Sequence, residues 1–177
     1  MAFKKDISDS DEPYRKGLFG FDVSQMKQMN HTNGRFHAIY FIDYLTGSLL
    51  LSNKYTDQSK FCETNEDLIG SFLNALNLFI NEINHNEDAE EEIREINFKD
   101  SRILYERRGR LMVIGFTKKT NLVIERTILQ NLLEDFYGRF EYKINHFNGI
   151  IDKEILSYKK NLNNSDLSKF FYKDLDL

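Results

Sequence analysis

Residues 36–55 read FHAIYFIDYLTGSLLLSNKY, and this stretch decides the fold class of the chain. Residues 36–43 are apolar on both alternating sets of positions, which is typical of a strand in the middle of a sheet that is covered on both faces. Residues 44–47, YLTG, predict a turn with glycine at a position that tolerates positive φ, and residues 48–55 follow as a second strand. We therefore expect the domain to begin with a β-hairpin.

Three further strands are expected over residues 93–99, 102–107 and 111–117. The link RRGR, residues 107–110, predicts a tight antiparallel turn around Gly109. The last of these strands contains LMVIGF, which is again apolar on both faces. Two such strands require helices on both sides of the sheet. The sequence therefore predicts an α/β (α+β) fold of order β-β-α-β-β-β-α-α, with about five mostly antiparallel strands between two helical layers.

The most clearly periodic segment is DLIGSFLNALNLFINEI, residues 67–83, which we expect to be a helix. Thr64 and Asp67 stand three residues apart at its start and fit a capping box. Its apolar residues share one face, which we expect to lie on the sheet. They are Leu68, Ile69, Phe72, Leu73, Leu76, Phe79, Ile80 and Ile83.

The opposite face of this helix carries no charge, although 29% of the residues in the chain are charged. It consists of Gly70, Ser71, Asn74, Asn77, Leu78 and Asn81. A second amphipathic helix, predicted over residues 121–140, has on its outward side Glu125, Arg126, Glu134, Asp135 and Arg139. Charge depletion on an outer helix face is typical of the core of a protein interface, although asparagine is also simply common in this sequence.

The predicted domain spans residues 36–162 and ends with a third helix over residues 152–161. Residues 1–35 are interpreted as a flexible N-terminal arm, in which the apolar residues 18–29 form a short docking segment. Residues 163–177 are expected to be a C-terminal tail or a short helix.

Composition excludes several classes of protein. The formal net charge is −4 and the pI is about 5.6, so we expect no nucleic acid partner, because phosphate binding needs a concentrated basic surface. No apolar stretch is long enough for a membrane span, and the N-terminus lacks the apolar core of a signal peptide. Cys62 is the only cysteine and cannot form an intramolecular disulfide. We expect a cytoplasmic protein with at most peripheral membrane contact.

No motif indicates catalysis. A P-loop pattern is absent from the sequence, and the four histidines, His31, His37, His85 and His146, have no ligand at a metal-binding interval. The acidic residues 85–92 are interpreted as a solvated loop rather than a cation site. Basic residues around the last three strands are interpreted as edge protection rather than as a surface for anionic lipid or an acidic partner. We expect no catalytic residue, no cofactor and no metal.

The hairpin FHAIYFIDYLTGSLLLSNKY, the stretch INFKDSRILYERRGRLMVIGFTKKT (residues 96–120) and the helix that follows resemble a longin domain of the longin and roadblock superfamily. The resemblance covers roughly residues 36–162. Two predicted C-terminal helices favour the longin branch, while the short segment at residues 21–29 keeps the roadblock branch as an alternative.

This resemblance implies a non-enzymatic interaction module that dimerises and acts with small GTPases or a membrane-trafficking-like complex. Its partner would be another longin or roadblock protein, or a second copy of itself, with a small GTPase as a further partner. Carried onto this sequence, the pairing surface is formed by Gly70, Asn74, Asn77, Leu78 and Asn81 beside strand 48–55. We expect charges at Asn74 or Leu78 to weaken assembly.

A second hypothesis is a small-ligand sensor or enzyme that uses a pocket between the sheet and the helices. Its candidate polar residues in the sheet are His37, Tyr40 and Tyr105.

Overall fold

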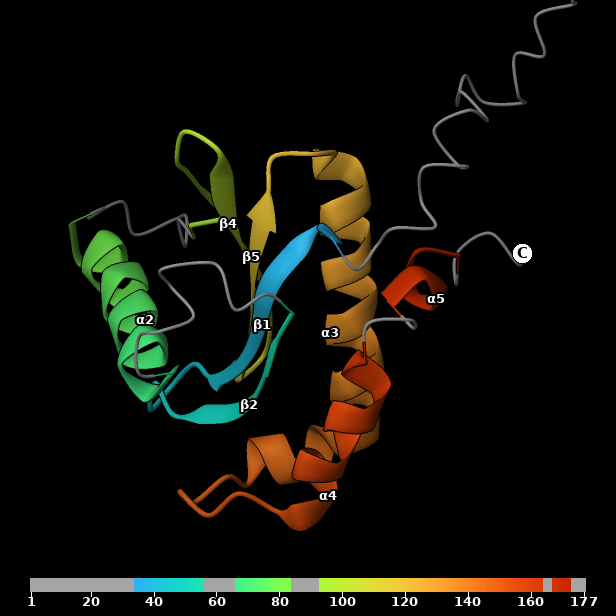
Figure 1. Ribbon diagram of the computed structural model, residues 1–177. Coiled ribbons are helices and arrows are strands. Elements are labelled where there is room, and N and C mark those ends of the chain that lie inside the picture. The colour runs from blue at the N-terminus through green and yellow to red at the C-terminus, as the bar shows by residue number, and fades with distance from the viewer. Residues whose placement is uncertain (1–33, 56–65, 84–92, 164–166, 173–177) are drawn as a thin grey trace, which may run out of the picture. The chain divides into compact units, whose positions relative to one another are not determined.

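A computed structural model describes residues 34–55, 66–83, 93–163 and 167–172, all within one unit, His31–Leu177 (Figure 1). The elements follow one another in the predicted order. They are β1 (Phe36–Asp43), β2 (Leu49–Lys54), α2 (Glu66–Ile83), β3 (Glu95–Asn97), β4 (Ser101–Arg108), β5 (Leu111–Lys118), α3 (Leu122–Asn145), α4 (Lys153–Ser157), a 3-10 helix (Tyr158–Leu162) and α5 (Leu167–Tyr172).

The five strands form one sheet of order β2-β1-β5-β4-β3, and every neighbouring pair is antiparallel. β1 and β5, the two strands that the sequence predicts to be apolar on both faces, lie side by side at the centre. Helix α2 lies on one side of the sheet and α3 on the other (Figure 1). The predicted fold class, with five antiparallel strands between helices on both faces, is confirmed.

The two faces of the sheet have different cores. On the α3 side, Phe41 of β1 packs against Phe136 of α3, with 4.4 Å between ring centroids, and Phe136 also contacts Tyr158 at 4.9 Å. On the α2 side lies a cluster of buried strand residues that includes Tyr40, Ile42 and Ile114. Burial of this kind is the main favourable contribution to folding.

Side-chain hydrogen bonds fix the start of α3. The Asn121 side chain accepts a hydrogen bond from the Ile124 amide at 3.2 Å and caps the helix. The Glu125 carboxylate is fully buried and accepts bonds from the Thr120 hydroxyl at 2.6 Å and the Thr117 hydroxyl at 3.1 Å. The prediction that Glu125 lies on the outward side of this helix is therefore wrong, because its carboxylate serves the donors of the strand-to-helix junction.

The β1–β2 turn is held by the carboxylate of Asp43, which is fully buried. It accepts hydrogen bonds from the Thr46 amide at 3.0 Å and the Thr46 hydroxyl at 2.6 Å. Arg110, from the β4–β5 turn, donates two hydrogen bonds to the same carboxylate, from its Nε at 2.8 Å and from a terminal nitrogen at 3.0 Å. Gly47 completes the turn at a φ of 70°, which is the positive φ that the sequence predicts.

Element bounds differ from the prediction at the C-terminal side. α3 runs to Asn145, five residues beyond its predicted end, and α4 ends at Ser157 and continues as the 3-10 helix. α5 packs on α3, where the Asn131 side-chain amide donates to the Phe170 carbonyl at 2.6 Å. The docking segment at residues 18–29 lies outside the described residues, and the division into arm, domain and tail stays a prediction. Among the described helices, none is long and apolar enough to cross a membrane.

We expect Arg110→Met to lower the free energy of unfolding by about 3 kcal/mol, because it leaves the buried Asp43 carboxylate without its cation. Urea denaturation followed by circular dichroism measures this. Arg108→Met is the matched control, since Arg108 pairs with Glu134 where both side chains are about half exposed, and we expect a loss of at most about 1 kcal/mol. Equal losses in the two variants would contradict the role given to Asp43.

Candidate protein-interaction surface

Helix α2 packs against the β1–β2 turn through Gly70 and Asn74. A Cβ atom added at Gly70 would lie 3.4 Å from Ile42 Cδ1 and 3.5 Å from the Gly47 carbonyl oxygen. A Cβ atom added at Gly47 would lie 3.2 Å from the side-chain nitrogen of Asn74. Leu73 and Asn74 are only 2% and 5% exposed. The helix surface formed by Gly70, Leu73 and Asn74 is therefore the one that faces the domain's own hairpin.

The packing of α2 on this turn differs from the orientation that the sequence predicts. The prediction that Gly70 and Asn74 point away from the core is wrong, because Gly70 has no side chain and allows the helix to approach the turn closely, and Asn74 lies against Gly47 of that turn. Leu78 does lie on the outer surface and is 47% exposed. The side chains of Asn77 and Asn81 lie outside the described residues. That these five residues bind a partner stays a prediction, of which only Leu78 has the required exposure among the side chains described.

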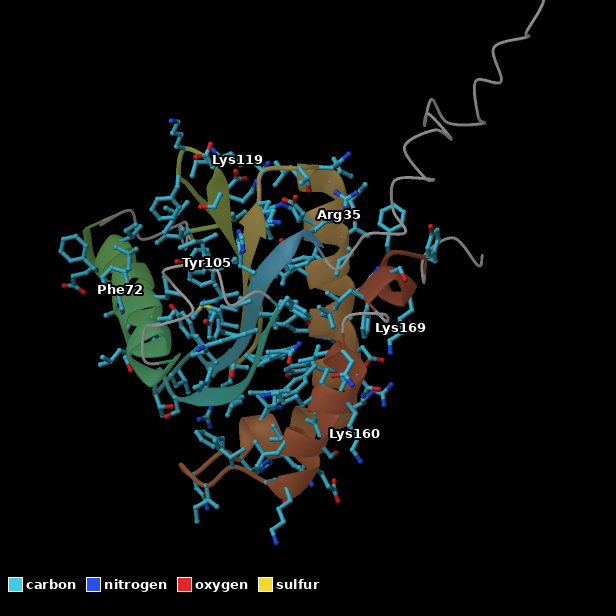
Figure 2. All side chains as sticks on the ribbon, viewed as in Figure 1. Arg35, Phe72, Tyr105, Lys119, Lys160 and Lys169 are labelled. Carbon is cyan, nitrogen blue, oxygen red and sulfur yellow. The ribbon has the colours of Figure 1, made fainter. Side chains whose placement is uncertain are left out.

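In this orientation, α2 has a continuous apolar surface on its outer side. Leu68, Phe72 and Phe79 are 64%, 64% and 61% exposed, and Ala75 between them is also exposed. We call Leu68, Phe72, Ala75 and Phe79 the α2 stripe; Figure 2 labels Phe72 on this helix. Its residues follow one another at intervals of four, three and four, the spacing of a helix-pairing seam. Contiguous exposed apolar residues, unlike scattered ones, mark interaction sites.

Sequence reasoning missed the α2 stripe because it assigned eight of the apolar residues of the helix, all except Leu78 and Ala75, to one buried face. That face is wider than a single packing contact needs. Leu73 from one edge of it is buried, whereas Phe72 and Phe79 from the other edge are exposed. The sequence did contain a signal for the stripe. Leu68, Phe72, Ala75 and Phe79 follow one another at intervals of four, three and four, so they can form a second packing surface beside the one that faces the sheet.

Two of the three residues nominated for a ligand pocket, Tyr40 and Tyr105, have packing roles. Tyr40 and Tyr105 belong to the core cluster on the α2 side, and Tyr105 lies on that side of the sheet in Figure 2. The Tyr40 ring meets Phe116 edge to face with 5.5 Å between centroids. Burial raises the pKa of the Tyr105 hydroxyl, and burial together with Lys118 lowers the pKa of His37. Both shifts favour the uncharged forms, as expected for groups that pack rather than bind ions.

Within the described part of the chain, no three histidine, cysteine or carboxylate side chains gather as metal ligands.

The arginines of β4 and of the β4–β5 turn contact partners inside the domain. Arg102 lies 3.6 Å from Glu95 and 3.5 Å from Glu125, Arg108 pairs with Glu134, Arg110 binds Asp43, and the Arg107 guanidinium lies 3.8 Å from the centre of the Tyr44 ring. Arg102 and Arg107 thus lie on opposite faces of the sheet, as strand alternation predicts. These residues are divided between the two faces and do not form one basic surface.

Comparisons with known proteins give structural likeness without sequence relatives. No family model matches the sequence, and no curated protein matches it. Among solved structures, the chain is similar to Myxococcus xanthus MglB, with 13% identity, coverage of 66% of this chain and 90% of that chain, and a TM-score of 0.49. It is also similar to a chain of a homology model of the full-length AP-3 complex in a stretched open conformation, with 15% identity, coverage of 76% and 96%, and a TM-score of 0.41. Neither likeness carries the functional argument, which rests on the α2 stripe.

Two substitutions on α2 test its orientation. We expect Asn74→Asp to lower the free energy of unfolding by on the order of 2 kcal/mol, because it buries a charge. Asn74 Oδ1 is buried and has no hydrogen-bond partner among the described residues, so the new carboxylate gains none there. Phe72→Asp should change stability by no more than about 0.5 kcal/mol, because the side chain is exposed. Urea denaturation measures both, and a stable Asn74→Asp beside an unstable Phe72→Asp would restore the orientation predicted from the sequence.

Proposed function

We propose that this domain is a non-enzymatic protein-interaction module of longin type, and that the α2 stripe is the surface on which its partner docks. The observation that supports the proposal is the exposure of three large apolar side chains, Leu68, Phe72 and Phe79, along one side of one helix. A stripe of this kind is costly to leave in water, since covering a leucine or phenylalanine contributes roughly 1.5–3 kcal/mol.

The form of the surface favours a protein partner. Residues at seam spacing fit an apolar helix lying alongside α2, or a groove that receives it. Ala75 lies within the stripe between Phe72 and Phe79, and a small residue between two large ones offers space for a side chain of the partner. Leu78 extends the apolar surface on one flank. These features describe docking of a macromolecule rather than enclosure of a small ligand.

The proposed partner is another longin or roadblock protein, or a second copy of this chain, and the assembled pair acts on a small GTPase or within a trafficking-like complex. β2, which α2 contacts, is an edge strand of the sheet. Edge strands offer unpaired backbone groups, so a partner covering α2 has a second place to bind nearby. This placement supports the expected use of the helix together with the second strand.

Binding measurements test the proposal directly. The full chain is immobilised as wild type, Phe72→Glu and Val123→Glu, and exposed to purified longin-like proteins and small GTPases from the same genome. We expect at least one to bind the wild type and to lose about tenfold or more in affinity for Phe72→Glu, as at a binding hot spot. Val123 of α3 is 62% exposed, and its substitution is the matched control that should leave binding unchanged.

If every partner that binds the wild type binds Phe72→Glu with the same affinity, the α2 stripe is not the docking surface.

A further inference from the structure

Helix α2 carries carboxylates but no cation. Its 18 residues include Glu66, Asp67 and Glu82, which lie at its two ends, and contain no lysine or arginine. The α2 stripe lies between these ends. In the sequence, acidic residues therefore stand on both sides of the apolar docking surface, one group at each end of the helix.

The surrounding sequence extends this asymmetry. Residues 61–93 hold nine of the 28 acidic residues of the chain and none of its 24 lysines and arginines. The remainder of the chain therefore has 24 basic against 19 acidic residues. The net charge of −4 is thus the sum of two unequal parts: a strongly acidic stretch that contains α2, and a remainder of the chain that is net basic. Charge separation of this degree steers association and selects partners.

This charge argues against a second copy on the stripe. In a two-fold symmetric interface the same surface of each copy forms the contact, so α2 would face α2 of the other copy. Both copies would then bring a helix with carboxylates and no cation to the interface. In paired helices the charges that flank the seam decide which partners are accepted, and like charges reject one another. The same negative charge opposes nucleic acids and anionic lipid surfaces.

We propose that the partner of the α2 stripe is a different protein chain, which presents an apolar helix or groove framed by lysine and arginine side chains. This inference rests on the proposed function and specifies its partner. Leu68, Phe72 and Phe79 supply the apolar contact, and the carboxylates at the ends of α2 select the basic frame. The expected assembly is thus heteromeric.

Two fluorescent helical peptides test the inference with the full chain. Both carry the same leucine seam, and the positions flanking the seam are lysine in one peptide and glutamate in the other. We expect fluorescence anisotropy to show the lysine peptide binding about tenfold or more tightly than the glutamate peptide, with a difference that shrinks as salt screens the charges.

Variants separate the apolar contact from the charge. Phe72→Glu adds a negative charge that would by itself strengthen attraction to the lysine peptide, so a loss of binding in this variant reports the apolar contact. We expect Phe72→Glu to bind the lysine peptide about tenfold more weakly than the wild type, and Val123→Glu, with the same added charge on α3, to retain binding.

The outcomes distinguish this inference from the proposed function. Equal binding of the two peptides, lost in Phe72→Glu, would overturn the basic-partner inference and keep the stripe as a docking surface. A wild-type dimer in light scattering that Phe72→Glu converts to a monomer would do the same. Lysine-peptide binding that is unchanged in Phe72→Glu would overturn both, because the peptide would then bind elsewhere.

Discussion

The orientation of α2 depends on the hydrogen bonds that the buried carboxylate of Asp43 accepts. It binds the amide and hydroxyl of Thr46 within the β1–β2 turn and the guanidinium of Arg110 from the β4–β5 turn. A buried charge held in this way fixes the backbone around it, because breaking any one contact leaves an unpaired group. The turn then presents Gly47 to Gly70 and Asn74 of α2. Gly70, Leu73 and Asn74 of the helix face the domain, while Leu68, Phe72 and Phe79 are turned outward.

The two helical layers consequently use their apolar surface differently. α3 buries ten of its residues against the sheet and the C-terminal helices, and its remaining surface carries ion pairs such as Arg139 with Asp135. α2 buries Ile69 and Leu73, but Leu68, Phe72 and Phe79 stay in water. A domain core that needed these side chains would cover them. The apolar surface left over on α2 is therefore available to another molecule, and the proposed interaction function follows from this asymmetry.

The fold could be predicted from the sequence, whereas the orientation of the key helix could not. Strands 36–43 and 111–117 are apolar on both faces, and this pattern alone requires two helical layers around a central pair. Periodicity shows which residues of a helix share a face, but not which part of a wide face meets the sheet. That choice depends on Gly70 and Asn74 fitting a turn that is distant in sequence. Glu125 was misplaced for a related reason, because its partners Thr117 and Thr120 lie across a strand-to-helix junction.

Hydroxyl-radical footprinting of the isolated chain tests the central claim most directly, since it reports the solvent contact of individual side chains on α2. Oxidation rates of each residue are compared between the native and the denatured protein. The account predicts that Phe72 and Phe79 react in the native protein nearly as fast as in the denatured one, while Leu73 of α2 and Phe116 of β5 are strongly protected. Protection of Phe72 and Phe79 equal to that of Phe116 would contradict it, because the stripe would then belong to the core of the domain.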